Sequence, residues 1–299
     1  MTSPIGFIGL GMMGTPMATR LAAAGHRLLV ADTAPAALGK FLQAHPGAAQ
    51  AAGLADFAGT PIVITMLPSS DAVDSVVRGA AGSSGLIGIL QPDSVLIDMS
   101  SSEPGRTRQL ASELAARRIH MLDAPVSGGV KRAVDGSLAI MVGGPAEIAS
   151  RCQPLFEAMG KTIKHVGGPG AGHAVKALNN YVSAAGLVAA AEALLVGRAF
   201  GLDPAVMTDV FNSSTGRNNS TENKLKQFIL SGRFDAGFSL RLMDKDLATA
   251  FKLAQDVGQP MELGQHLISL WHEAAGALPP QADHTEIYRY LEGDAAHKS

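Results

Sequence analysis

The chain has 299 residues, of which 46% are hydrophobic and 17% charged, and its formal net charge is −2. This length suggests two domains with a large buried core, and the charge leaves no electrostatic footprint for nucleic acid or an acidic membrane surface. The one cysteine, Cys152, excludes an internal disulfide, and the nine histidines lack metal-ligand spacing, so no metal is expected.

The chain opens with a pattern typical of a dinucleotide-binding unit. An apolar strand from Ile5 ends in a glycine-rich turn, a helical segment covers residues 15–25, and a second strand over 28–31 stops at Asp32. The glycines allow a tight turn, approach of a pyrophosphate and close helix packing, and the helix N-terminus offers N–H groups to phosphates. A purely structural turn is the alternative. The turn comprises Gly9, Leu10, Gly11, Met12, Met13 and Gly14.

Asp32 predicts which dinucleotide binds. A carboxylate here hydrogen-bonds the ribose 2′-hydroxyl of NAD and repels the 2′-phosphate of NADP. The residues up to Gly39 include no Arg or Lys that could compensate a phosphate. NAD is therefore the expected cofactor and NADP the less favoured one, and Asp32 could also cap the following helix.

Strand-like and helix-like segments alternate up to about residue 166. Unbroken apolar runs such as 61–67 and 94–98 suit parallel strands that are covered on both faces. These patterns predict an N-terminal Rossmann-type, doubly wound α/β domain over residues 1–166. The other expected elements are helices over 103–118 and 146–159 and strands over 119–126, 138–142 and 162–166.

From residue 167 to 299 the patterns predict an all-helical domain for substrate binding and dimerisation. A helix over residues 174–200 would be about 40 Å long. Its small side chains would admit another helix closely, so a homodimer or homotetramer is expected. Its apolar stretch 182–196 is short for a lipid span and indicates a buried helix. With no signal peptide apparent, a cytoplasmic protein without membrane contact is expected.

Candidate ligand-binding residues follow the predicted strands, where open α/β sheets bind their ligands. Pro68 could equally be a turn residue and Ser101 equally a helix cap. A hydroxyl followed by two unhindered backbone N–H groups, at Ser127, Gly128 and Gly129, would form a cradle for a carboxylate. The strand-end candidates for the cofactor are Met66, Leu67, Pro68 and Ser101.

The start of the long helix carries the candidate proton carrier. Lys176, Asn179 and Asn180 are spaced i, i+3 and i+4 and share one face. A lysine on an apolar face ordinarily extends to water, but beside a dinucleotide site it could act as a general base. Either asparagine could hold the substrate or orient the amine. His173 is the one histidine of interest, because it lies close to Lys176.

The motifs together resemble the β-hydroxyacid dehydrogenase family, which includes 3-hydroxyisobutyrate dehydrogenase, tartronate semialdehyde reductase and 6-phosphogluconate dehydrogenase. They occur in order over nearly the whole chain. The resemblance implies an NAD-dependent oxidoreductase that interconverts a small 3-hydroxy carboxylate and its semialdehyde or oxo acid. The matching segments are residues 8–18, 66–68, 98–101, 123–129, 170–180 and 242–247.

The resemblance also implies roles for individual residues. The glycine-rich turn and Asp32 would hold the adenosine and pyrophosphate, and the 66–68 and Ser101 positions would line the nicotinamide. The segment 127–129 would bind the substrate carboxylate. Lys176 would be the acid/base, with Asn180 beside the substrate. Lys245 would reach from the helical domain towards the cofactor; without the family it would be read as a surface ion pair with Asp244 and Asp246.

Two alternatives remain open at this point. Imine reductases have a similar architecture, but their catalytic position generally lacks the lysine found here as Lys176. A non-catalytic dinucleotide sensor would bind NAD without turnover. The family often has Asn where this chain has Arg20, which puts the local helix packing in question. The loop over residues 213–221 matches no one member well enough to name the substrate.

Overall fold

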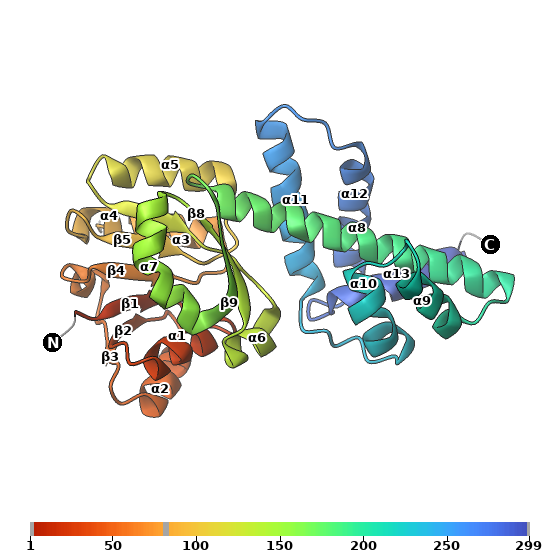
Figure 1. Ribbon diagram of the computed structural model, residues 1–299, viewed down its shortest axis with the longest axis horizontal. Helices are drawn as coiled ribbons and strands as arrows, with labels where there is room; N and C mark the ends of the chain where they lie inside the picture. The colour runs from red at the N-terminus through yellow and green to blue at the C-terminus, as the bar shows by residue number, and fades with distance from the viewer. Residues whose placement is uncertain (1–2, 80–83, 298–299) are drawn as a thin grey trace. The chain divides into compact units, whose positions relative to one another are not determined.

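The protein, seen in a computed structural model that describes residues 3–79 and 84–297, divides into two compact units, residues 1–176 and 177–299 (Figure 1). The N-terminal unit is a β-sheet with helices on both faces, and the C-terminal unit is helical. The predicted fold class is therefore confirmed. The predicted domain boundary after residue 166 stays a prediction.

The sheet has the strand order of a doubly wound fold. The strand order β3-β2-β1-β4-β5-β6 is parallel throughout and matches the Rossmann arrangement. Beyond β6 the sheet continues through β8, which runs antiparallel to β6 and β7 and parallel to β9. The strands are β1 (Ile5–Ile8), β2 (Leu28–Ala31), β3 (Ala49–Gln50), β4 (Ile62–Thr65), β5 (Val95–Asp98), β6 (His120–Asp123), β7 (Val126–Ser127), β8 (Leu138–Gly143) and β9 (Gly160–Gly167).

Alternate side chains of the central strands enter two separate cores, as their period of two requires. Phe7 and Ile97 pack on one face, whereas Val63 and Leu96 pack on the other. The first face is covered by α1 (Gly14–Ala23), α2 (Pro35–Ala44), α6 (Gly129–Asp135) and α7 (Ala146–Met159). The second face is covered by η1 (Leu54–Phe57), α3 (Ser70–Arg78), α4 (Leu86–Ile89) and α5 (Pro104–Ala115).

The single strand expected over residues 119–126 is interrupted, so this prediction was wrong. β6 ends at Asp123, and the chain then turns through Pro125 into β7. Pro125 has no N–H to donate to a ladder, but its carbonyl accepts a hydrogen bond from the Met141 N–H at 3.1 Å. The short strand β7 consequently pairs antiparallel with β8 instead of continuing beside β5.

Arg20 is accommodated in the helix packing of the first face. Its guanidinium donates a hydrogen bond to the carbonyl of Ala158 in α7 at 3.3 Å. It also lies against Gly136, at the end of α6, where an added Cβ would come within 2.6 Å of Arg20 Nε. The residue that departs from the family pattern thus ties α1 to both neighbouring helices.

The C-terminal unit is built on α8 (Ala171–Phe200), a helix of 30 residues that starts in the N-terminal unit. Its buried face, including Leu187, Ala191 and Leu194, packs in one core with Trp271 of α12. The other elements are α9 (Pro204–Ser213), α10 (Asn219–Asn223), a π-helical segment η2 (Leu225–Leu230), α11 (Leu240–Asp256), α12 (Glu262–Ala277), η3 (His284–Glu286) and α13 (Ile287–His297).

The outer face of α8 is apolar. Val182, Val196 and Phe200 have exposed fractions of 67%, 71% and 83%. The helix is long and apolar enough to cross a membrane by length and composition, with a mean hydropathy of 1.5 in a window that is 39% buried. Core helices of soluble proteins meet the same test.

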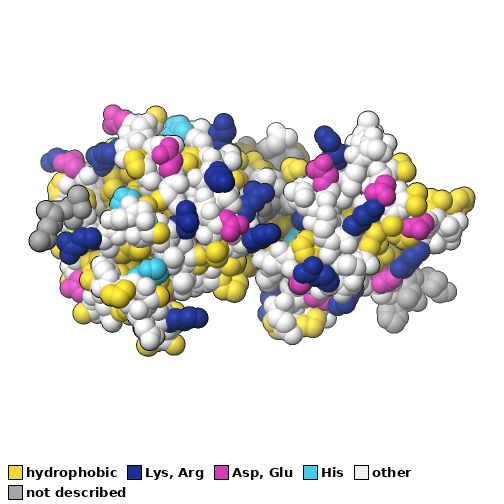
Figure 2. Space-filling view, turned by 60° about the horizontal axis from the view of Figure 1, so that its bottom comes forward, with side chains coloured by type: hydrophobic (Ala, Val, Ile, Leu, Met, Phe, Trp, Pro, Cys, Tyr) yellow, Lys and Arg dark blue, Asp and Glu magenta, His cyan; other side chains and the backbone are white. Residues whose placement is uncertain are grey.

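On the face seen in Figure 2, Lys and Arg side chains are separated by uncharged surface and accompanied by Asp and Glu.

Candidate functional site

The parallel strands end in register, which brings the predicted strand-end residues to one edge of the sheet. The pairing matches Ile8 with Ala31 and Thr65, then Thr65 with Asp98 and Asp98 with Asp123. The residues that follow these strand ends include Gly9, Asp32 and Met66. This edge is where open α/β sheets bind ligands.

Glycine is needed at the three positions of the first turn for different physical reasons. Gly9 has φ = +104°, and a Cβ there would collide with the carbonyl oxygen of Met66; a Cβ on Gly14 would collide with the carbonyl oxygen of Gly9. These two glycines are required by the protein's own packing. A Cβ on Gly11 would meet no protein atom within 4 Å, so the space beside it is open to a ligand.

Asp32 holds the turn from the end of β2. Its Oδ2 accepts the Leu10 N–H at 2.5 Å and its Oδ1 accepts the Ala34 N–H at 2.6 Å. Since an ionised carboxylate has about four acceptor positions, capacity remains for hydroxyl donors of a ligand. Ala34, and not Asp32, is the N-cap residue of α2.

The segments after β4 and β5 are joined to each other and to the glycine-rich turn. The Leu67 N–H donates to Ser100 Oγ at 2.9 Å, and a Cβ on Gly9 would lie 3.1 Å from Leu67 Cδ2. Pro68 follows directly. The N-cap residue of α5 is Glu103, which makes no side-chain cap hydrogen bond.

The segment 127–129 contains two glycines with positive φ angles. Ser127 is half-buried and pairs with Ala139 across β7 and β8. Gly128 and Gly129 have φ values of +130° and +67°, a region that favours glycine. α6 then begins at Gly129, so the first N–H groups of the helix follow the Ser127 hydroxyl.

The start of α8 is clamped to the end of β6. Asp123 Oδ1 accepts the Gly170 N–H at 2.8 Å, and its Oδ2 accepts the His173 N–H at 2.9 Å. A Cβ on Gly172 would lie 2.6 Å from the backbone oxygen of Asp123, so only glycine lets the helix lie this close to the sheet. Lys176 follows one turn later, with an exposed fraction of 8%.

His173 belongs to a buried network that sequence reasoning did not resolve. Its Nε2 lies 3.0 Å from the Ser100 carbonyl oxygen and its Nδ1 lies 2.8 Å from Thr107 Oγ1. Carboxylate oxygens of Asp98 and Asp123 lie 3.7 and 3.8 Å from the ring nitrogens. Asp98 ends the strand predicted over 94–98, whereas Asp123 lies inside the strand predicted over 119–126, so the pattern of strand ends indicates only one of the two acids.

In the C-terminal unit, Asp246 joins two of the predicted residues; it was expected as an ion-pair partner of Lys245 and not as a residue of the site. Asn180 Nδ2 donates to Asp246 Oδ2 at 2.6 Å, and Lys245 Nζ lies 3.5 Å from Asp246 Oδ1. Asn179 Nδ2 donates to Asn180 Oδ1 at 3.2 Å. Asp246 is only 4% exposed, so the ion pair of Lys245 involves a buried carboxylate.

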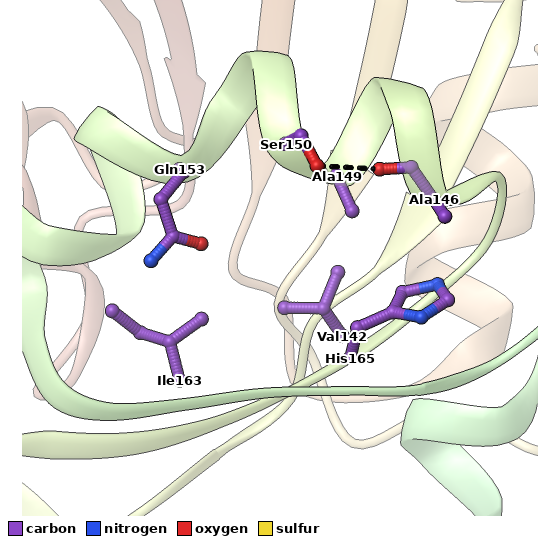
Figure 3. A pocket seen from close by; sticks show the side chains of 7 residues that line it. All are labelled: Val142, Ala146, Ala149, Ser150, Gln153, Ile163 and His165. Atoms are coloured by element: carbon purple, nitrogen blue, oxygen red, sulfur yellow. Dashed lines mark hydrogen bonds between the residues drawn. The ribbon is translucent and has the colours of Figure 1, made fainter.

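A hollow of about 140 Å³ lies between α7 and the strands β8 and β9 (Figure 3). Its polar side chains are already bonded to protein groups: Ser150 Oγ to the Ala146 carbonyl at 3.0 Å, Gln153 Nε2 to Glu157 Oε1 at 3.0 Å and His165 Nε2 to the Gly144 carbonyl at 2.8 Å. None of the predicted site residues lines it, and we do not assign the site to it. The lining residues are Val142, Ala146, Ala149, Ser150, Gln153, Ile163 and His165.

Family models match nearly the whole chain. Residues 4–167 match the NAD-binding domain of 6-phosphogluconate dehydrogenase. Residues 170–291 match the family described as NAD-binding of NADP-dependent 3-hydroxyisobutyrate dehydrogenase. The two matches cover the glycine-rich turn and the start of α8, respectively.

Individual relatives agree with the family models. The chain is 40% identical to 3-hydroxyisobutyrate dehydrogenase of Pseudomonas aeruginosa over 97% of this chain and 98% of the relative. It is 36% identical to 2-(hydroxymethyl)glutarate dehydrogenase of Eubacterium barkeri over 87% of this chain and 85% of the relative. A solved structure of Mycobacterium tuberculosis 3-hydroxyisobutyrate dehydrogenase with L-serine has a TM-score of 0.88 at 32% identity, covering 97% and 99%.

A doubly wound sheet with a glycine-rich turn, followed by an all-helical unit, defines an NAD-binding oxidoreductase. The chain belongs to the β-hydroxyacid dehydrogenase family. It is an enzyme that oxidises or reduces a hydroxy acid with a nicotinamide dinucleotide, and NAD is its cofactor.

Proposed function

We propose that the protein interconverts a small 3-hydroxy carboxylate and its semialdehyde or oxo acid, with Lys176 as general acid and base. The observation that carries this proposal is the burial of Lys176, at 8% exposure, one turn beyond the clamp by Asp123. An amine held on a helix tied to the ligand-binding edge of the sheet is positioned for proton transfer.

The residues divide the work as follows. In oxidation, neutral Lys176 accepts the proton of the substrate hydroxyl, and in reduction its ammonium form returns it. The backbone N–H groups and hydroxyl of Ser127, Gly128 and Gly129 hold the substrate carboxylate. Asn180 contacts the substrate with its amide fixed by Asp246. NAD supplies the hydride acceptor, and NADH the donor.

The residues of the glycine-rich turn fit this cofactor. The open space at Gly11 suits a pyrophosphate, and the remaining acceptor capacity of Asp32 suits the ribose hydroxyls. The negative charge of Asp32 favours NAD over NADP. The segments around Leu67, Pro68 and Ser101 line the nicotinamide, and Lys245 assists cofactor binding.

Lys176→Ala tests this proposal. We expect its kcat with NAD and a panel of short 3-hydroxy acids, followed by NADH absorbance, to fall by roughly 10²–10⁴-fold. The NAD dissociation constant should stay within a factor of about two, because the glycine-rich turn is unchanged. Lys161→Ala, which removes an exposed lysine of β9, is the matched control. Normal turnover by Lys176→Ala would remove this residue from the mechanism.

The same panel separates the remaining alternatives. A dinucleotide sensor would bind NAD and transfer no hydride to or from any member of the panel. An imine-reductase-like enzyme would oxidise none of the hydroxy acids but would reduce a cyclic imine with the reduced cofactor.

A further inference from the structure

Lys224 is a buried cation that the reaction described above does not use. It follows α10 in the C-terminal unit and is 9% exposed. Its Nζ donates to Ser183 Oγ at 3.3 Å, and among the described residues no carboxylate forms an ion pair with it. A buried ammonium with one neutral partner is unfavourable, because burial removes its hydration without replacing the opposite charge.

The negative charge of Asp283 attracts the Lys224 ammonium, but the two side chains do not form an ion pair. The Asp283 carboxylate accepts hydrogen bonds from the Gly237 and Phe238 N–H groups and from the Thr285 hydroxyl, at 2.8, 3.1 and 2.6 Å. His284 Nδ1 also lies 3.2 Å from it. The acceptor positions of Asp283 are therefore occupied by other donors, and the charge on Lys224 is left without a close counter-charge.

Ser220, close to Lys224 in the chain, carries a buried hydroxyl without a hydrogen-bond partner among the described residues. Ser220 is 1% exposed, and its Oγ makes no hydrogen bond to any described residue. The Lys224 N–H donates to the Ser220 carbonyl at 2.9 Å, so the two residues are one helical turn apart. Buried polar groups are nearly always bonded, and two under-satisfied ones on successive turns indicate a position for a ligand group.

Ser183, the partner of Lys224, lies on the face of α8 that carries the proposed acid/base, Lys176. Lys176, Asn180 and Ser183 are spaced i, i+4 and i+7, which places them on one helix face. Helix α10 packs on α8 close to Ser183, since a Cβ on Gly186 would lie 3.4 Å from Asn218 Cγ at the α10 N-cap. Ser183, which Lys224 contacts, therefore lies on the same face of α8 as Lys176 and Asn180.

The backbone changes from an α-helix to a π-helical segment at Lys224. The N–H groups of Phe228 and Ile229 both donate to the Lys224 carbonyl, at 3.0 and 3.3 Å, at the start of the π-helical segment η2. The wider turn of a π-helix accommodates one more residue than an α-turn, and such segments are frequent at functional sites.

We propose that Lys224, with Ser183 and Ser220, binds a second anionic group of the substrate, in addition to the carboxylate that we assign to residues 127–129. The inference rests on the proposed function and narrows it to 3-hydroxy acids with an additional carboxylate or comparable anion. Lys224 supplies the charge, and the two hydroxyls supply hydrogen bonds. An anion here removes the cost of leaving the ammonium buried and unpaired.

Two substrates that differ in the second carboxylate provide the test: 3-hydroxyisobutyrate and 2-(hydroxymethyl)glutarate, each assayed with NAD. We expect wild type to have the lower KM for the diacid. Lys224→Gln should raise the KM of the diacid by roughly tenfold to a hundredfold, with the KM of the monoacid and both kcat values little changed. Lys226→Gln is the matched control, since Lys226 is exposed, lies two residues away and pairs with Asp209.

The outcomes distinguish this inference from the proposed function. Turnover of the monoacid with no advantage for the diacid, or an equal change of both KM values in Lys224→Gln, overturns the subsite alone. No turnover of either acid overturns the reaction, but a diacid-induced rise in melting temperature that Lys224→Gln loses would still support the subsite. If Lys224→Gln does not fold, Ser220→Ala decides, because it removes no observed hydrogen bond; an unchanged KM for the diacid would overturn the subsite.

Discussion

Lys224 places a buried charge in the C-terminal unit at a cost in stability. Burial lowers the pKa of Lys224 to about 8, from an ordinary value of 10.5, and the attraction of Asp283 only partly opposes this. For Asp283 the balance is reversed: burial would raise its pKa, but hydrogen bonds from His284 and Thr285 outweigh burial and hold the pKa below its usual range. Burial of the charge is therefore unfavourable for Lys224, whereas hydrogen bonds compensate it for Asp283.

We therefore expect Lys224→Met to stabilise the protein at neutral pH. At pH 7 the amine is charged in both the folded and the unfolded chain, so the full penalty applies, about 3 kcal/mol for this lowering of the pKa. Above about pH 8 the folded state loses the proton first, and the penalty fades towards the unfolded pKa of 10.5.

Denaturant unfolding of wild type and Lys224→Met at pH 7 and near pH 10 measures this difference. The advantage of the variant in free energy of unfolding should be largest at pH 7 and shrink towards pH 10. Lys226→Met, at an exposed position, should show no such trend. A variant that is less stable than wild type at pH 7 would contradict the expectation and indicate that the ammonium is stabilised in the folded state.

The residues that were predicted and those that were missed differ in a physical way. Asp32 and Lys176 lie in short local patterns, whose spacing carries the information. Asp246 and Lys224 act through contacts with Asn180 and Ser183, which are 66 and 41 positions away in the chain. A lysine in a polar segment ordinarily indicates a solvated face, and only the packing of distant helices buries it.

At the scale of the elements, the close approach of α8 to the sheet depends on one missing side chain. Gly172→Ala would push a Cβ against the backbone oxygens of Met141 and Asp123. Neither can move without disturbing β8 or β6, so we expect a loss of about 1–3 kcal/mol in free energy of unfolding. Turnover should fall as well, because Lys176 follows on the same helix.

Gly168→Ala provides the control for this prediction. It lies four residues earlier, has no left-handed backbone and would meet no atom within 4 Å. Thermal unfolding of the two variants should therefore differ, with Gly168→Ala close to wild type. Equal melting temperatures would mean that the start of α8 can shift away from the sheet without loss.

The elements themselves were largely predictable. The helix expected over 146–159 coincides with α7, and that expected over 103–118 contains α5. Apolar runs between helices located the parallel strands, because burial on both faces leaves few polar positions. The division between β6 and β7 depends on the pairing of β7 with β8, which is not local in the sequence. The π-helical segment η2 depends on a wider helical turn of the backbone. Neither feature has a residue pattern of its own.

For the whole molecule, the apolar outer face of α8 and the low net charge favour self-association. Apolar side chains exposed along one helix usually mark an interface. We expect sedimentation to give a mass that is a multiple of 30.8 kDa. Val196→Lys should reduce assembly, whereas Val134→Lys, at another exposed apolar position on α6, should not. A wild-type monomer at micromolar concentration would contradict this, and flotation with lipid vesicles would assign the face to a membrane.

The continuity of α8 sets a rule for how this chain can diverge. Lys176 and Ser183 lie on one uninterrupted helix, so inserting or deleting one residue between them would rotate one relative to the other by about 100°. Natural variation in this stretch is therefore expected to exchange side chains while conserving its length. The loop before α10 lies outside this helix, so a change in its length would leave the spacing of Lys176 and Ser183 along α8 unchanged.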